Sequence, residues 1–177
     1  MARNSLPHID YVRECLDYNP NTGEFHWRER PLEHFRNNQA HSCWNTKYAE
    51  RPAGGYNTFG HVYIRLVHLF AAHRLAWLLF HGEPIPDVID HVDHNPANNR
   101  IRNLRAATHS DNMANSVLSA NNTTGHKGIK IIKNRFVVQI MHLGVRRRLG
   151  TFSTIEEAAE ARRIAAERLY GEFNRQK

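Results

Sequence analysis

Two acid–histidine pairs lie three residues apart in the segment DVIDHVDHNPANNRIRNLRAATHSDN, which spans residues 87–112. They are Asp90-His91 and Asp93-His94, and a group of asparagines follows them. An aspartate beside a histidine can supply a metal-binding carboxylate together with a group that takes a proton from water near neutral pH. The segment therefore predicts a site for metal-assisted hydrolysis, and it raises the question of which pair carries the chemistry.

The elements around these pairs predict a compact ββα unit. Residues 88–90 are a short apolar run typical of a strand, and residues 103–108 read as a second strand. A helix should follow over about 110–117, and Ser110 or Thr108 can cap it. In such a unit, a side chain at the end of the first strand and one in the first turn of the helix can meet on one metal ion.

Asp90 and Asn112 occupy these two positions. Both offer oxygen atoms, which suit a hard cation such as Mg²⁺. His91 projects to the other side of the strand end, so it would not share the role of ligand and can accept a proton from water. The metal would stabilise the charge that builds on a phosphate and on its leaving oxygen.

The segment VIDHVDHNPANNRIRNLRAATHSDN resembles the core of the HNH endonuclease family, in its phage and homing-endonuclease branch. Asn103 lies 12 residues after His91 and Asn112 lies 9 after Asn103, which is the spacing of that family. The resemblance covers about residues 8–116. It implies a ββα-metal (His-Me finger) core with a β-rich N-terminal part, and one Mg²⁺ or Mn²⁺ per active site. It also implies His91 as general base, Asp90 and Asn112 as metal ligands, and Asn103 as the brace of the loop that holds His91.

The second pair departs from the family pattern, because the family usually carries a small residue, often glycine, where this chain has His94. Asp90-His91 follows the apolar run Val88-Ile89, whereas Asp93-His94 precedes a turn signal. Spacing to the later asparagines also fits the first pair alone. We therefore assign the chemistry to Asp90-His91, and His94 is either a solvated loop residue or a phosphate contact.

Upstream of this core the pattern predicts a short amphipathic helix over 8–18 and a hairpin at NPNTGEFHW. Residues 31–50 show no periodicity and read as irregular. Residues 61–70 read as extended, and 71–82 as a helix that stops at Gly82. Among the remaining histidines, we expect His73 to be a packed side chain. The others do not have the spacing of a zinc site: His26, His34, His41, His61 and His68.

The whole formal charge of +7 lies near the C-terminus. Residues 1–120 carry 12 basic and 12 acidic residues, while residues 121–177 carry 12 basic against 5 acidic. A basic block attracts polyanions, of which nucleic acid is the commonest, although it can also serve as a solubilising surface. This asymmetry favours duplex DNA as the partner.

The basic part predicts a second domain of three strands and one helix. GIKII, RFVVQIMHL and VRRRLGTF are the strand candidates, and STIEEAAEARRIAAERLYG is a helix with a capping box and a closing glycine. We expect the chain to comprise residues 1–117 with the nuclease core at about 71–117, a linker over 118–126, and the second domain over 127–177. The overall class is α+β, with a small three-stranded antiparallel sheet packed on one helix.

One face of that sheet should carry the basic side chains. In RFVVQIMH, alternate residues Phe136, Val138 and Ile140 should pack on the helix, which leaves Arg135 and Gln139 on the outer face. Arginine and glutamine on such a face can pair with guanine and adenine edges, and lysine with phosphates. The segment also resembles the plant ethylene-response-factor (APETALA-two) DNA-binding domain, on its Lys127-Gly128-Ile129 opening and LGTF turn, although the tryptophans usual on that sheet are missing. The DNA-contact candidates are Lys127, Lys130, Arg135, Gln139, Arg146 and Arg148.

These features together predict a phage-type homing endonuclease that cuts duplex DNA, acting as a monomer or a homodimer. The alternatives are a non-enzymatic, sequence-specific DNA-binding regulator and a nuclease directed at RNA. No apolar run long enough to span a membrane and no secretory signal occur. Cys15 and Cys43 have no metal spacing, so we expect a reduced, intracellular protein. The resemblance to phage proteins implies the cytoplasm of a bacterial host.

Overall fold

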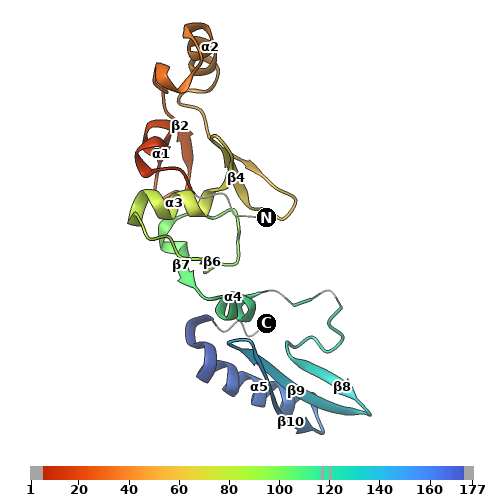
Figure 1. The fold of residues 1–177 in the computed structure, drawn as a ribbon. Helices are drawn as coiled ribbons and strands as arrows, with labels where there is room; N and C mark the ends of the chain where they lie inside the picture. The colour runs from red at the N-terminus through yellow and green to blue at the C-terminus, as the bar shows by residue number, and fades with distance from the viewer. Residues whose placement is uncertain (1–5, 117, 120, 174–177) are drawn as a thin grey trace. The chain divides into compact units, whose positions relative to one another are not determined.

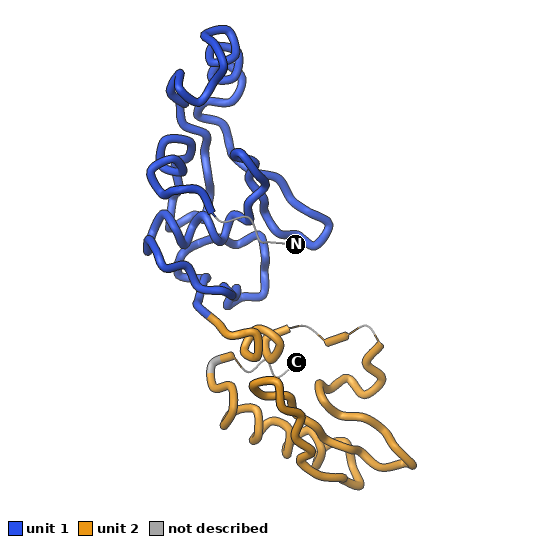
Figure 2. Tube along the Cα trace, in the orientation of Figure 1, with its two compact units in different colours: residues 1–106 blue, residues 107–177 orange. Residues whose placement is uncertain are grey.

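The computed structural model describes residues 6–116, 118–119 and 121–173, apart from the side chain of residue 172. It divides into two compact units, residues 1–106 and 107–177 (Figure 2). Small antiparallel sheets and helices alternate along the chain, which confirms the α+β class (Figure 1). Within the described part of the chain, no helix is long and apolar enough to cross a membrane.

The first unit begins with a helix and a hairpin. Helix α1 (Ile9–Cys15) leads directly into β1 (Leu16–Tyr18), which pairs antiparallel with β2 (Phe25–Trp27). The intervening turn is closed by Asn19, whose Oδ1 accepts hydrogen bonds from the next backbone amides. The helix and the hairpin predicted from the sequence are both confirmed.

The expectation of irregular structure over 31–50 is wrong for most of that stretch. A 3-10 turn, η1 (Leu32–His34), precedes helix α2 (Asn38–Tyr48), which is capped by the Asn37 side chain. None of the residues of α2 is buried, so its sequence carries no apolar stripe from which a helical period could be read. Its contacts are aromatic and polar instead: Trp44 packs edge-on against Trp27 with ring centroids 5.2 Å apart, and Asn45 exchanges hydrogen bonds with the Arg30 backbone.

A three-stranded sheet and a helix form the core of the first unit. Strands β3 (Gly55–Tyr56), β4 (Val62–Arg65) and β5 (Leu69–Ala71) lie in that order, and α3 (Ala72–His81) follows β5 directly. The helix ends where Gly82 takes a positive φ of 77°, as the sequence predicts. The largest fully buried side chains of this unit are aliphatic: Val12, Ile64, Leu75 and Leu78.

The two strands predicted around the acid–histidine pairs are present. Strand β6 (Val88–His91) pairs with β7 (Leu104–Ala107), and the 3-10 turn η2 (Ile101–Asn103) leads into β7. Ile89 and Leu104 belong to the same buried cluster as the side chains of α1 and α3. Burial of these two residues therefore ties the strand pair to the core, and it fixes the direction of the residues that follow Ile89.

The second unit starts with α4 (His109–Asn115), which Thr108 caps through a capping box with Asp111. Strands β8 (Ile129–Ile132), β9 (Arg135–His142) and β10 (Val145–Phe152) form an antiparallel sheet in the order β10-β9-β8. Helix α5 (Ile155–Tyr170) covers one face of this sheet (Figure 1). The three-stranded sheet on one helix matches the prediction, whereas the ββα arrangement of β6, β7 and α4 and the predicted domain boundaries remain predictions.

Helix α5 is fixed at both ends as its sequence indicates. The predicted capping box is present and joins Thr154 with Glu157. Gly171 follows the last helical residue with a φ of +51°. On the sheet side, Val138 and Ile140 of β9 pack against alanines and Tyr170 of the helix, which confirms the predicted inner face of β9.

Candidate active site

The first acid–histidine pair lies at the end of β6 and is buried. Asp90 is 5 % exposed and His91 is 7 % exposed. Buried charged or titratable side chains are uncommon unless they are paired, so their presence at a strand end points to a functional arrangement. The pair is held by the apolar residue before it, Ile89, which sits in the core.

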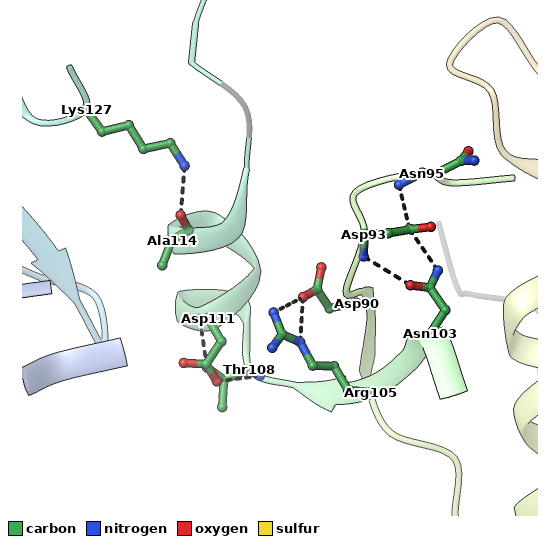
Figure 3. Close-up of polar contacts among 9 residues, drawn as sticks. All are labelled: Asp90, Asp93, Asn95, Asn103, Arg105, Thr108, Asp111, Ala114 and Lys127. Carbon is green, nitrogen blue, oxygen red and sulfur yellow. Dashed lines mark hydrogen bonds and ion pairs between the residues drawn. The ribbon is translucent and has the colours of Figure 1, made fainter. Parts of the chain in front are cut away.

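Arg105 of β7 forms an ion pair with Asp90 (Figure 3). Its Nε and Nη2 donate to Asp90 Oδ2 at 3.0 and 2.8 Å. Charge-assisted hydrogen bonds of this kind fix the plane and direction of a carboxylate. Arg105 was not predicted from the sequence, because its contact with Asp90 depends on the register between two strands that are separated by a loop.

Asn103 forms hydrogen bonds across the loop between the two strands. Its Oδ1 accepts a hydrogen bond from the Asp93 amide at 3.0 Å, and its Nδ2 donates to Asp93 Oδ1 at 2.9 Å (Figure 3). The same Nδ2 donates to the Asn98 carbonyl at 2.8 Å. Asn103 is 7 % exposed, so these bonds are shielded from competing water. The side chain therefore locks both ends of the loop that follows His91.

The second acid–histidine pair belongs to that loop and has a different environment. The Asp93 carboxylate accepts hydrogen bonds from the Asn95 amide at 2.9 Å and from Asn98 Nδ2 at 2.6 Å. Partial burial raises the pKa of the Asp93 carboxyl, but hydrogen bonds from Asn98, Asn95 and Asn103 outweigh it and hold the pKa below its usual value. The side chain of Asp93 therefore acts as a turn-forming acceptor.

His94 adopts a left-handed backbone conformation with a φ of +62°. Its amide donates to the His91 carbonyl at 3.0 Å, which closes a tight turn directly after the first pair. A residue with a Cβ is disfavoured in this conformation, and glycine is not. The departure of His94 from the pattern of the family that the segment resembles therefore falls at a position where a Cβ is unfavourable.

Three histidines meet around the first pair. The ring of His73, on α3, lies 5.3 Å from that of His91, and the ring of His61, just before β4, lies 5.9 Å from both. His73 is packed, as the sequence predicts, but its contact with His61 was missed. The sequence gives no signal for it, because these residues come from three separate elements.

Burial keeps this histidine cluster neutral. Loss of solvation lowers the pKa of His73 to about 3, with further lowering from His91, His61 and Arg74. Burial also lowers the pKa of His91, against a raising contribution from a hydrogen bond with Asn99. The pKa of His61 is lowered by burial as well. A neutral His91 imidazole at neutral pH can accept a proton, as a general base must.

The donors predicted for a metal ion fit a hard cation. Asp90 offers a carboxylate at the end of β6 in the first unit, and Asn112 offers an amide oxygen from an exposed position on α4 in the second unit, so their meeting on one ion stays a prediction. The described residues contain no group of three or more histidine, cysteine, aspartate or glutamate side chains that could hold a metal. A set of one carboxylate and one amide suits an ion that keeps water ligands and binds substrate phosphate, as Mg²⁺ does.

The predicted DNA-contact residues of the second unit fall mainly on one sheet face. Residues opposite one another in an antiparallel pair share a face. Gln139 is opposite Arg148 and Met141 is opposite Arg146, while Val137 is opposite Lys130. These basic residues and Arg135 are exposed, and their face lies opposite the one that α5 covers.

Lys127 has another environment. Its Nζ donates to the Ala114 carbonyl at 2.7 Å (Figure 3) and lies 3.3 Å from the Ser116 hydroxyl. These groups are at the C-terminal end of α4, where backbone carbonyls lack helical partners. The ammonium group thus stabilises the end of this helix within the second unit.

Comparisons with known proteins agree with the assignment of the central segment. Residues 70–114 match the family described as HNH endonuclease. An uncharacterised HNH endonuclease of Acanthamoeba polyphaga mimivirus is 36 % identical over 104 residues, which cover 57 % of this chain and 54 % of that protein. The chain therefore spans about half the length of this curated relative. No solved structure matches.

Proposed function

We propose that the chain is a metal-dependent DNA endonuclease whose chemistry is carried by Asp90-His91. The observation that supports this best is the burial of the pair at one strand end, with Arg105 directing the carboxylate and Asn103 bracing the following loop. The match of residues 70–114 to HNH endonucleases supports the same reaction class. A purely structural strand pair would not need a buried carboxylate beside a buried, neutral imidazole.

His91 acts as general base in this proposal. Its neutral imidazole accepts a proton from a water molecule as the water oxygen forms a bond to phosphorus and the bond from phosphorus to the 3′ oxygen breaks. The products carry a 5′-phosphate and a 3′-hydroxyl end. The edge-to-face packing of His73 on His91, at an interplanar angle of 80°, restrains the ring while it does so.

A divalent ion would be held by Asp90 and Asn112. When bound, it supplies positive charge that stabilises the phosphate and the leaving oxygen in the transition state. Mg²⁺ and Mn²⁺ both suit this pair of oxygen donors, with one ion for each active site. Arg105, which donates twice to Asp90 Oδ2, keeps the carboxylate from turning away.

The basic sheet face serves as the DNA anchor. Lys130, Arg146 and Arg148 lie on exposed strand positions of one face, and Gln139, opposite Arg148 on the neighbouring strand, can read a base edge. Replacing these three basic residues by alanine should weaken binding and reduce the salt slope of log K by about 0.9 for each phosphate that the protein no longer neutralises. Binding measured by fluorescence anisotropy across a salt series checks this, and an unchanged slope would remove the sheet from the DNA interface.

The nuclease proposal is tested by nicking of a supercoiled plasmid. The wild-type chain should nick the plasmid in Mg²⁺ or Mn²⁺ and stop when EDTA is added. Retained DNA binding with no cleavage in either metal would favour the alternative, a non-enzymatic sequence-specific regulator. Preferential cleavage of an RNA substrate would point to the RNA-directed alternative. Mapping the nicks on phage DNA would test whether the enzyme is a phage homing endonuclease with a defined target.

A further inference from the structure

The turn between β3 and β4 holds an aromatic side chain out in solvent. Phe59 is 79 % exposed, the largest exposed fraction among the large apolar side chains of the described residues. Single exposed apolar residues are common on protein surfaces and by themselves need no explanation. The position of Phe59 is informative because the turn that carries it is rigid and adjoins the candidate active site.

The rigidity comes from Asn57. Its Oδ1 accepts hydrogen bonds from the amides of Phe59 and His61, both at 2.9 Å. Its backbone amide donates to the His61 carbonyl at 2.9 Å, and its carbonyl accepts from the Gly60 amide at 3.0 Å. Four hydrogen bonds to one residue fix the backbone of the turn. The outward direction of Phe59 is therefore set by the structure of the turn.

The same turn packs against the loop between β6 and β7. Gly60 has a φ of +82°, and a Cβ placed on it would be 3.3 Å from Cγ of Pro96, which lies in the loop that follows the two acid–histidine pairs. His61, the next residue, places its ring 5.9 Å from the ring of His91. Phe59 is thus within two residues of direct contacts with both the loop and the proposed general base.

An aromatic side chain beside a group that acts on phosphodiesters has a specific use. Apolar wedges such as phenylalanine insert between adjacent base pairs, partly unstack them and bend the duplex. The cost of unstacking is smallest at flexible pyrimidine–purine steps, so a wedge gives a sequence preference without hydrogen bonds to bases. The bend can also present a phosphate to a residue that lies below the surface, as His91 does.

We propose that Phe59 is a DNA wedge that inserts at a base step beside the phosphodiester cut with the help of His91. It would act as a specificity-determining residue and favour nicks next to pyrimidine–purine steps. This inference rests on the proposed nuclease function, because it needs duplex DNA to lie over the Asp90-His91 site. The turn hydrogen bonds of Asn57 keep the wedge at a fixed distance from that site.

Permanganate footprinting with the full-length protein tests the wedge. Permanganate oxidises unstacked thymines, and the His91→Ala variant bound to a supercoiled plasmid avoids cleavage during the reaction. We expect protein-dependent reactive thymines at TA or TG steps, read by primer extension. Adding Phe59→Ala to this variant should reduce their reactivity about tenfold, whereas Phe59→Leu, which keeps an apolar wedge, should retain most of it.

Val67→Ala is the matched control. Val67 is 66 % exposed and lies in the turn between β4 and β5, beyond Arg65; the four residues of β4, which separate this turn from His61, span roughly 13 Å at about 3.3 Å per residue. Its replacement should leave the footprint unchanged. Because both side chains are exposed, each alanine variant should melt at the temperature of the parent protein, which a thermal scan verifies.

The outcomes separate the wedge from the nuclease. Reactive thymines that persist in Phe59→Ala, or bound DNA without any reactive thymine, would overturn the wedge, even if the wild-type protein nicks the plasmid. Reactive thymines that depend on Phe59 would support it, even if no nicking occurs and the nuclease proposal fails. If both hold, the nicks of the wild-type chain should lie within a few base pairs of the reactive positions.

Discussion

The two acid–histidine pairs have the same residue types and lie three residues apart, yet they have opposite structural roles. Asp90-His91 is buried at the end of β6, where it contacts Arg105 and the histidine cluster. Asp93-His94 lies on an exposed loop, where a backbone amide and an asparagine side chain of the same loop donate hydrogen bonds to the Asp93 carboxylate. The difference shows that the role of such a motif depends on the element that holds it, here the end of an apolar strand for one pair and a turn for the other.

The comparison predicts effects of very different size for the same substitution at the two aspartates. Asp90→Asn keeps the shape of the side chain but removes the charge of the proposed ligand, and we expect cleavage to fall by roughly 10²-fold or more, equivalent to the several kcal/mol a catalytic metal supplies. Titration calorimetry with Mn²⁺ should show weaker metal binding by the same variant. Asp93→Asn should change the cleavage rate far less.

Equal loss of cleavage in Asp90→Asn and Asp93→Asn, with both proteins folded by circular dichroism, would remove the distinction between the two pairs. Unchanged metal binding in Asp90→Asn would remove Asp90 from the ligand set even if cleavage were abolished.

The histidine cluster beside the first pair predicts that the free energy of unfolding depends on pH. Because burial lowers the pKa of His73 from 6.5 to about 3, the unfolded chain binds more protons than the folded chain between these values. The contribution of His73 to the free energy of unfolding is therefore fully present above pH 6.5. It falls as pH decreases, by about 1.4 kcal/mol per pH unit, or about 2 kcal/mol at pH 5.

Urea unfolding followed by tryptophan fluorescence measures this loss, because Trp27, Trp44 and Trp77 all lie in the first unit. His73→Phe, which keeps a ring against His91 but cannot be protonated, should reduce the loss between pH 7.5 and pH 5. An identical pH dependence in wild type and variant would mean that His73 is not held neutral by burial.

Removing the loop carboxylate should cost stability with little direct effect on chemistry. In Asp93→Ala, Asn98 and Asn103 lose a hydrogen-bond acceptor. We expect the free energy of unfolding to fall by about 1–2 kcal/mol. Hydrogen bonds to buried charged groups contribute somewhat more, but this side chain is exposed. The same urea experiment measures it. A variant as stable as wild type would show that the loop does not depend on Asp93.

The smallest expected effect is at His94. His94→Gly removes a Cβ from a residue with a positive φ, and the relief of strain should exceed the entropy cost of glycine by about 0.5–1 kcal/mol. Cleavage should be unchanged if His94 is a solvated loop residue. A stable variant that binds DNA more weakly would instead support its role as a phosphate contact.

Where the sequence carried a periodic signal, the fold was predictable from it. Helix α5 and the three strands before it follow from apolar alternation and from the Thr154 cap. Helix α2 could not be predicted in this way, because none of its residues is buried and its contacts are aromatic side chains distant along the chain. Apolar periodicity reports burial, and an unburied helix leaves no such pattern.

The candidate site divides in the same way. The preference for Asp90-His91 followed from the apolar run before it and from its spacing to Asn103 and Asn112, and the structure buries that pair directly after Ile89 of the core. The neighbours that tune the pair, Arg105 and His61, were not predictable, because they reach it through strand register and through a separate hairpin. Local patterns locate reactive residues, and tertiary contacts determine their environment.

The most direct test of the central claim is the single-turnover nicking rate of two matched variants, His91→Ala and His94→Ala, in Mg²⁺ with DNA binding measured in parallel. Loss of the general base should lower the rate by about 10²- to 10⁴-fold in His91→Ala, with DNA binding near that of wild type. His94→Ala should stay within about twofold of wild type. A full rate in His91→Ala, or an equal loss in His94→Ala, would contradict the assignment of the chemistry to the first pair.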